Sequence, residues 1–358
     1  MNDDKPFRAL ALDGGGFRGL YTATILEELG RFFGGDTAGD LGRQFDLITG
    51  TSTGGILACG LALGVPPKRI IDLYEKEGPK IFTNPLPRRL FGKVGWAVRN
   101  AFQAANPATA LKNALVEIFG EKTLGAVYAD RRIAVCLPSI RMVDEKSKVF
   151  KTPHDQRFVI DKNYTLVDVC LATSAAPVFL PMHVIEDAVN HGQRLAFADG
   201  GLWANNPTLV ALIEALEICH QLDREMSSKR SIEILSIGTC SVPDGNPPDG
   251  KVDRGLFDWW GGIKTTRVAM NAQAAAAHYI ANLLSQRITE LGRSVRVVRI
   301  DDPSISPDQA RHLQLDLATP DSIQTLKQLG STRAQAVMSD SSNPHYSDGQ
   351  FIKRIFSN

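Results

Sequence analysis

Residues 50–54 read GTSTG and place Ser52 between two glycines in the pattern G-x-S-x-G. This pattern is typical of a nucleophile elbow, a sharp turn between a strand and a helix that projects a serine hydroxyl. The apolar run FDLIT precedes it and the helical run GILACGLAL follows it, and Gly50 and Gly54 would let the two backbones approach across the turn. The sequence therefore predicts Ser52 as a nucleophile at a helix N-terminus, where unpaired N–H groups stabilise negative charge. An ordinary Gly/Ser-rich helix start is the alternative.

A second glycine-rich turn, DGGGFRG, begins at residue 13 after the strand-like run FRALAL. Its glycines have the G-x-G-x-x-G spacing of a dinucleotide-binding turn. A dinucleotide-binding fold needs an acidic residue at the end of its second strand, but here that strand ends in ITGTSTG. The other interpretations are a turn without a ligand and an oxyanion hole beside the serine, built from backbone N–H groups and a nearby positive charge. The residues of this predicted oxyanion hole are Gly14, Gly15, Gly16 and Arg18.

A nucleophilic serine needs a general base within hydrogen-bond reach. The seven histidines lie in no recognisable motif, so a Ser-His-Asp triad stays open without a particular histidine to complete it. The better candidate is Asp199, because the strand-like run LAFAD leads directly into the base motif of Gly200 and Gly201. This places a carboxylate at a strand end, as the elbow places Ser52. The alternative is a turn aspartate, the more common role of Asp-Gly.

The three motifs D-G-G-G-x-R-G, G-x-S-x-G and D-G-G, in this order, resemble those of the patatin-like phospholipases, lipid acyl hydrolases with a Ser-Asp dyad. ATSAAPVFLP (172–181) and LSIGT (235–239) also match that family's pattern, so the resemblance runs from residue 8 to about 240. It implies that Ser52 is the nucleophile of a phospholipase A, that Asp199 is its base, and that the reaction passes through an acyl-enzyme. It implies no metal and no cofactor, whereas a calcium-dependent phospholipase would need a coordinating acidic loop.

Apolar strand-like runs alternate with helical runs along the chain, a pattern that favours βαβ units and a mainly parallel sheet. We therefore expect a patatin-like three-layer α/β/α fold in one domain, residues 1–358, with a basic lid-like insertion at about 78–112 and a helical C-terminal part at about 263–340. The predicted strands cover residues 7–13, 45–50, 131–140, 194–199, 232–240 and 295–301. The predicted helices cover residues 21–33, 55–64, 206–222, 266–287 and 321–337.

The basic insertion has no acidic residue between Glu77 and Glu117. Its cations and helically spaced apolar residues indicate a basic amphipathic helix, either a lid that contacts anionic lipid or a solvated helix packed on the domain. The cations are Lys80, Arg88, Arg89, Lys93, Arg99 and Lys112, and the apolar residues are Phe91, Val94, Val98 and Phe102. The tryptophan pair Trp259 and Trp260 is a second candidate for membrane contact, or part of the core.

Composition limits where the protein acts. The 40 Lys and Arg residues almost balance the 39 Asp and Glu residues, so no overall field attracts a nucleic acid polymer. The N-terminus MNDDKPFRAL lacks the basic and apolar regions of a signal peptide. Five cysteines without a C-x-x-C pair suggest neither a disulfide framework nor a zinc site. We expect a cytoplasmic protein that binds peripherally to the inner face of the membrane when active.

Within the patatin-like group, the chain also resembles bacterial phospholipases that cyclic dinucleotides activate in anti-phage defence. The resemblance rests on the compact length, the basic insertion and the run LDLATPDSIQTLKQLG (315–330), and it implies a cyclic dinucleotide activator for which no binding residue can be assigned. A homo-oligomer is a further expectation. Two other functions stay open: a nucleotide-binding module that uses the glycine-rich loop, and an esterase of the same fold that acts on non-lipid substrates.

Overall fold

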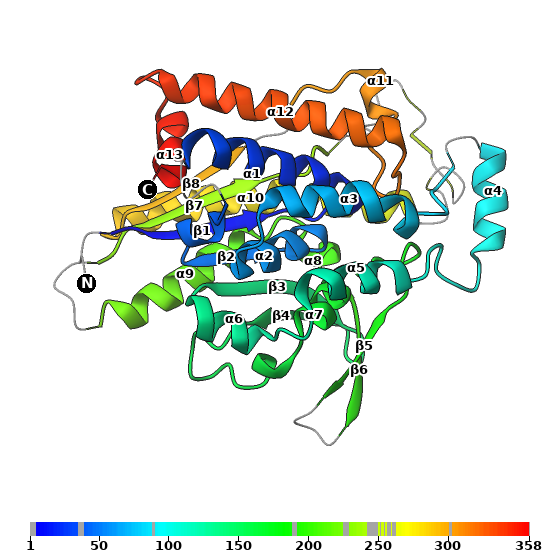
Figure 1. Ribbon diagram of the computed structural model, residues 1–358, viewed down its shortest axis with the longest axis horizontal. Coiled ribbons are helices and arrows are strands. Elements are labelled where there is room, and N and C mark those ends of the chain that lie inside the picture. Colours follow the sequence, from blue (N-terminus) through cyan, green and yellow to red (C-terminus); the bar gives the residue numbers. More distant parts are fainter. Residues whose placement is uncertain are drawn as a thin grey trace.

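The computed structural model describes residues 5–34, 39–87, 90–187, 192–224, 229–241, 250, 252–253, 255, 259, 263–300 and 303–357. In this part of the chain an eight-stranded sheet runs through the centre of the molecule (Figure 1). Its strands are β1 (Phe7–Leu12), β2 (Leu47–Gly50), β3 (Ala134–Arg141), β4 (Lys146–Lys151), β5 (His183–Asp187), β6 (Gln193–Asp199), β7 (Ile232–Ile237) and β8 (Val295–Ile300).

The strand order is β5-β6-β3-β2-β1-β7-β8, with β4 paired to β3. From β3 to β8 the neighbouring strands run parallel. Antiparallel pairs occur where β4 and β6 join β3 and where β5 joins β6. The predicted mainly parallel sheet is confirmed. The sequence did not indicate β4 and β5, which form antiparallel pairs at the β3 side of the sheet.

Helices cover both faces of this sheet, which confirms the predicted three-layer arrangement (Figure 1). Because side chains alternate along a strand, β1 sends Leu10 and Leu12 into one core and Ala9 and Ala11 into the other. The first core is closed by α1 (Gly19–Phe33), α2 (Thr53–Leu63), α3 (Pro67–Ile81), α5 (Thr109–Phe119), α6 (Leu124–Arg131), α7 (Leu166–Thr173), α12 (Pro320–Ser342) and α13 (Ser347–Phe356). The second core is closed by α9 (Thr208–Leu222) and α10 (Ile263–Glu290).

The basic insertion begins in the last turn of α3 and ends in the first turn of α5, and between them it contains α4 (Leu90–Arg99), which projects from the body of the molecule (Figure 1). The prediction that Phe102 belongs to this helix is wrong, because α4 ends at Arg99 and Phe102 is fully exposed beyond it. The inward side chain is instead Trp96, whose Nε1–H donates to the Asn84 carbonyl at 3.1 Å and whose ring lies beside Phe179.

Some of the predicted membrane-contact residues are outside the described part of the chain. They are Arg88, Arg89, the side chain of Phe91, and Trp260. Trp259 is half-buried. Val94 and Val98 remain as exposed apolar residues on α4.

Candidate active site

Two strands meet end to end at the predicted dyad. Cys136 of β3 pairs with Thr49 of β2 and with β4, and Ser139 of β3 pairs with Asp199 of β6 and also with β4. Because β4 occupies one edge of β3 along this whole stretch, β2 and β6 must share the opposite edge. They run in opposite directions, so their carboxyl ends face each other. The residues that follow β2 and end β6 are thereby brought together, although about 150 positions separate them in sequence.

The turn after β2 has the strained geometry of an elbow. Ser52 has φ = 55°, in the left-handed region that a non-glycine residue rarely adopts. Its N–H donates to Thr173 Oγ1 at 3.0 Å. A Cβ atom on Gly50 would lie 2.0 Å from the Gly54 carbonyl oxygen, and one on Gly54 would lie 2.3 Å from the Leu12 carbonyl oxygen. Both glycines therefore permit the close backbone approach that the sequence predicted.

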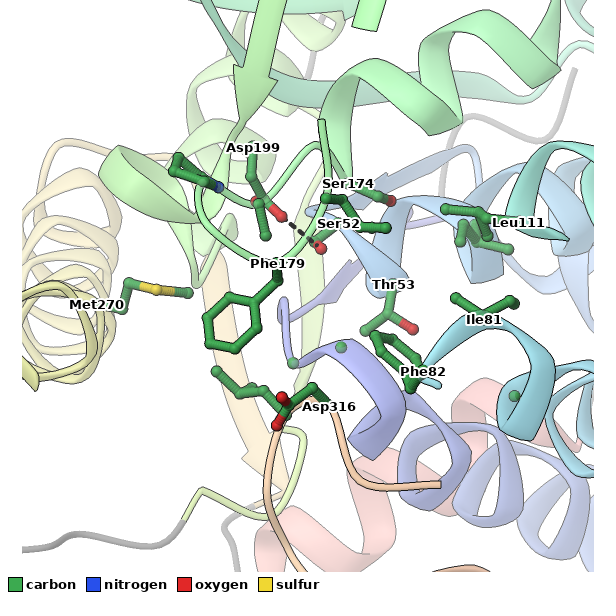
Figure 2. A pocket seen from close by; sticks show the side chains of 18 of the residues that line it. Ser52, Thr53, Ile81, Phe82, Leu111, Ser174, Phe179, Asp199, Met270 and Asp316 are labelled. Atoms are coloured by element: carbon green, nitrogen blue, oxygen red, sulfur yellow. Dashed lines mark hydrogen bonds between the residues drawn. The ribbon is translucent and has the colours of Figure 1, made fainter. Parts of the chain in front are cut away.

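Ser52 and Asp199 form a direct, buried hydrogen bond (Figure 2). Ser52 Oγ donates to Asp199 Oδ2 at 2.8 Å, and the Gly201 N–H donates to Asp199 Oδ1 at 2.6 Å. Gly200, which lies between Asp199 and Gly201 in sequence, packs closely on the Pro138 carbonyl. Burial raises the pKa of Asp199 to about 6, against the opposite effect of these two hydrogen bonds. The carboxylate is thus held in place by the backbone and is a stronger base than an exposed aspartate.

The glycine-rich loop after β1 presents two N–H groups rather than three. The N–H of Gly14 donates to the Asn205 carbonyl at 2.8 Å, so the prediction that it contributes to an oxyanion hole is wrong. No hydrogen bond within the described residues engages the N–H groups of Gly15 and Gly16, and both residues line the cavity beside Ser52.

The carbonyl groups of this loop show how those two N–H groups are aimed. The Gly14 carbonyl accepts from Thr239 Oγ1 at 2.9 Å, and the Gly15 carbonyl accepts from the Arg18 N–H at 3.1 Å. In a trans peptide the carbonyl and the following N–H point in opposite directions. Fixing the Gly14 and Gly15 carbonyls therefore also fixes the Gly15 and Gly16 N–H groups.

Arg18 contacts the carbonyl side of this loop. Its side chain is buried, does not line the cavity, and donates from Nε to the Gly15 carbonyl at 3.4 Å. We expected a positive charge beside the oxyanion, and the structure places the guanidinium on the loop's carbonyl side. Gly16 has φ = +56°, a conformation that favours glycine at this turn.

Ser52 lies at a cavity of about 120 Å³ with mainly apolar walls. Figure 2 shows Ile81, Phe82 and Leu111 on one side of Ser52 and Met270 on the other. Among the described residues, no lysine, arginine or histidine lines this cavity, and its two carboxyl groups belong to Asp199 and Asp316. The site can therefore accommodate an apolar chain next to a nucleophile, a base and two backbone donors.

Comparison with known proteins agrees with this geometry. The family model described as patatin-like phospholipase matches residues 10–212. The chain belongs to the patatin-like phospholipase family. Its enzyme class is therefore that of the lipid acyl hydrolases.

The chain is also similar to known phospholipases over nearly its whole length, beyond the segment that the family model matches. A cGAMP-activated phospholipase of Pseudomonas aeruginosa is 35% identical over 338 residues, which cover 93% of this chain and 90% of that protein. A cGAMP-activated phospholipase of Vibrio cholerae is 31% identical, and the match covers 90% of this chain and 89% of that protein. A cUMP-AMP-activated phospholipase of Escherichia coli is 26% identical, with 92% and 90% covered.

The phospholipase site also depends on residues that its motifs do not reveal. Asp13 forms an ion pair with Arg299 of β8 at 2.6 Å, and Arg299 also donates to Ser236 Oγ at 2.8 Å. This contact ties the start of the glycine-rich loop to two strands from the second half of the chain. Asp316 and Thr173 were missed as well. Thr173, Ser236 and Asp316 lie in runs quoted above, but those runs do not show which residues they contact. Thr173 contacts Ser52 and Asp316 contacts Leu86, each more than a hundred positions away.

One cluster within the described residues has a set of side chains that could hold a metal ion: Cys136, His154 and Glu214. None of them lines the phospholipase cavity. Glu214 already accepts from Lys151 Nζ at 2.5 Å and faces His154 Nε2 at 2.8 Å. The cluster is thus a satisfied polar network. In the same part of the chain, no helix combines the length and the apolar character needed to cross a bilayer.

Proposed function

We propose that this chain hydrolyses carboxylic esters of membrane phospholipids, with Ser52 as nucleophile and Asp199 as general base. The observation that carries the proposal is the 2.8 Å hydrogen bond from Ser52 Oγ to a buried, backbone-held carboxylate at an apolar cavity.

The first half of the reaction forms an acyl-enzyme. Asp199 accepts the Ser52 proton as Oγ attacks the ester carbonyl, and the N–H groups of Gly15 and Gly16 stabilise the oxyanion. The protonated Asp199 then donates to the leaving lysophospholipid oxygen. In the second half, Asp199 accepts a proton from the water that attacks the acyl-serine, and it returns this proton to Ser52 Oγ as the fatty acid is released. A pKa of about 6 leaves Asp199 mostly ionised at neutral pH and still basic enough to take the proton.

The walls of the cavity indicate how the substrate lies. The apolar side formed by Ile81, Phe82 and Leu111 suits an acyl chain. A phosphate group would meet two carboxyl groups there and no described cation. We therefore place the acyl chain inside the cavity and the head group at its mouth, which also argues against the nucleotide-binding alternative.

We further propose that a cyclic dinucleotide activates the enzyme, in the setting of bacterial anti-phage defence. The support is that relatives named for such activation cover about nine-tenths of this chain without a large unmatched segment. Those relatives are named for different activators, cGAMP and cUMP-AMP. The panel of cyclic dinucleotides in the experiment below determines which nucleotide activates this chain. Self-association is also a prediction, tested by the molar mass in solution with and without the nucleotide.

Membrane contact through α4 is the third part of the proposal. Val94 and Val98 are exposed, and Lys93 and Arg99 lie on the same helix. An apolar stripe with flanking cations suits a peripheral helix on anionic lipid. In this arrangement the helix rests on the bilayer, and the cavity lined by Phe179, on which Trp96 packs, receives an acyl chain from the bilayer.

The deciding experiment measures free fatty acid released from mixed phospholipid vesicles, with each of a panel of cyclic dinucleotides and without any. We expect release by the wild type with one nucleotide and none by Ser52→Ala or Asp199→Asn. A soluble short-chain ester tested in parallel separates an esterase from a phospholipase. Hydrolysis of the soluble ester alone would contradict the lipid substrate, and a wild type without hydrolysis or labelling by a fluorophosphonate would contradict the hydrolase.

A further inference from the structure

The phospholipase mechanism leaves one buried carboxyl group of its cavity unused. Asp316 follows α11 (Pro307–Ala310) and precedes α12, and its side chain is 3% exposed. No described cation forms an ion pair with it. A buried carboxyl group without a cation is costly, and a well-packed apolar residue would cost less. Burial raises the pKa of Asp316 to about 6, which agrees with this cost.

Asp316 binds the segment that leads into α4. Its Oδ2 accepts from the Leu86 N–H at 2.6 Å. Leu86 stands between Pro85 and Pro87, and proline has no N–H. The Leu86 N–H is therefore the only backbone donor that this three-residue segment offers, and Asp316 takes it.

The residues around Leu86 are connected to Phe179, which lines the cavity. Asn84 N–H donates to Asn106 Oδ1 at 3.0 Å, and Asn106 N–H donates to the Phe179 carbonyl at 3.0 Å. Trp96 packs on the Phe179 ring, which lines the cavity. We call the described residues 82–87 and 90–106 the cap. Asp316 thus holds the cap near its first residues, and the Asn106 N–H holds its last residue on the Phe179 carbonyl.

The neighbouring residue, Leu315, holds the oxyanion loop. Its carbonyl accepts from the Phe17 N–H at 2.7 Å. A Cβ atom on Gly16 would lie 2.3 Å from that carbonyl oxygen, so the two backbones are in close contact. Two consecutive residues therefore join the cap to the loop that carries the Gly15 and Gly16 N–H groups. Figure 2 shows Asp316 on the side of the cavity below Phe179.

We propose that Asp316 is a positioning residue, whose hydrogen bond from Leu86 fixes the cap against the oxyanion loop and so sets both the cavity mouth and the oxyanion donors. The inference rests on the proposed phospholipase function. Loss of the bond lets the cap move, which raises KM for phospholipid. It also frees Leu315, which lowers kcat because the Gly16 N–H is less well placed.

The test uses the full chain with cGAMP and, in parallel, with cUMP-AMP. The substrates are vesicles of phosphatidylethanolamine and phosphatidylglycerol and a soluble short-chain ester. Asp316→Ala removes the acceptor, and we expect kcat/KM on vesicles to fall about tenfold, as for a lost charge-assisted hydrogen bond. Asp316→Asn keeps an oxygen acceptor, so it should restore activity to within about threefold of wild type. The matched control is Asp308→Ala, which removes an exposed aspartate from the preceding helix and should change nothing.

Leu86→Pro removes the same bond from the donor side. Because both variants break one contact, the double variant Leu86→Pro/Asp316→Ala should be no worse than the more impaired single variant. Independent, multiplying losses would overturn the proposal. So would an Asp316→Asn enzyme as impaired as Asp316→Ala, since charge would then matter rather than the hydrogen bond. Thermal unfolding and fluorophosphonate labelling of each variant exclude a folding defect.

Failure of this proposal can be told apart from failure of the proposed function. If the wild type releases fatty acid and Asp316→Ala matches it in both kcat and KM, the positioning role is wrong and the phospholipase stands. If the wild type neither hydrolyses vesicles nor labels at Ser52, the phospholipase function itself is wrong.

Discussion

The catalytic floor and the cap of this molecule are built in different ways. The floor consists of Ser52, Asp199 and the Gly15–Gly16 N–H groups, which lie at the ends of β2, β6 and β1. They are set by the backbone of these turns, with added contacts from the Thr173 and Thr239 hydroxyls. The cap is held to the rest of the molecule by the Asp316 side chain, which accepts from the Leu86 N–H, and by the Ala105 and Asn106 N–H groups, which donate to the Val178 and Phe179 carbonyls. The comparison indicates that the chemistry is rigidly preset while access to it depends on few contacts. Changes in the floor should therefore abolish the reaction, and changes in the cap should tune it.

The largest expected effect is the loss of either dyad member. Ser52→Ala should lower fatty acid release by at least about 10³-fold, since removal of a catalytic serine eliminates the covalent route. Asp199→Asn should lower it by about 10²- to 10⁴-fold, the range of general base catalysis. Release is measured on vesicles, with circular dichroism to verify folding. If Ser52→Ala releases fatty acid at the wild-type rate, Ser52 is not the nucleophile.

A smaller loss is expected from the oxyanion loop. Thr239→Val removes the hydroxyl that holds the Gly14 carbonyl and so frees the Gly15 N–H. We expect kcat to fall about tenfold with KM nearly unchanged, less than for removal of an oxyanion donor itself. Thr24→Val, a buried hydroxyl on α1, is the matched control. An equal loss in both variants would assign the effect to general destabilisation.

The pH dependence of kcat/KM should report the titration of Asp199 in the floor and not that of Asp316 in the cap. Asp199 must be ionised to act as a base, so kcat/KM should fall about tenfold per pH unit below its pKa of about 6 and level off above it. Asp316→Asn should leave this acidic limb in place. The profile is measured on a soluble ester, so that vesicle properties do not change with pH. If the acidic limb of the kcat/KM profile shifts in Asp316→Asn, the titrating group is Asp316 and not Asp199.

The same carboxylate should reduce stability at neutral pH. Asp199 has a raised pKa in the folded state, so between its ordinary pKa of 3.8 and about 6 the folded state keeps a proton that the unfolded chain releases. Stability from this group is therefore full below about 4 and decreases as pH rises to about 6. Asp199→Asn should raise the free energy of unfolding at pH 7.5, by about 3 kcal/mol at most. Denaturant unfolding at pH 4.5 and 7.5 measures this, and an equal difference at both pH values would contradict it.

The smallest effect is expected on α4. Val98→Glu places a charge on its exposed side and should weaken binding to anionic vesicles by a few-fold without changing hydrolysis of a soluble ester. Val143→Glu, also at an exposed valine but away from α4, is the control. Equal losses in the two variants would show that α4 has no special contact with lipid.

The sequence predicted the floor more completely than the cap for a physical reason. Short-range motifs specify local backbone, so the elbow of Gly50–Gly54 and the strand end at Asp199 were visible in the sequence. The errors in the floor are Gly14 and Arg18: the Gly14 N–H donates to the Asn205 carbonyl, which lies about 190 residues away, and the Arg18 guanidinium lies on the carbonyl side of the loop. The six predicted strands are present because their apolar character marks burial. β4 and β5 pair at the side of the sheet and α4 stops at Arg99, and these features depend on tertiary contacts that no periodicity reveals.

The measurement that tests the central claim most directly is mass spectrometry of the wild type after treatment with a fluorophosphonate, with and without the panel of cyclic dinucleotides. We predict one adduct, on Ser52, and much slower labelling in Asp199→Asn, because the serine is activated by that carboxylate. Absence of an adduct on Ser52 under every condition, or equal labelling rates in the two proteins, would contradict a Ser52–Asp199 dyad.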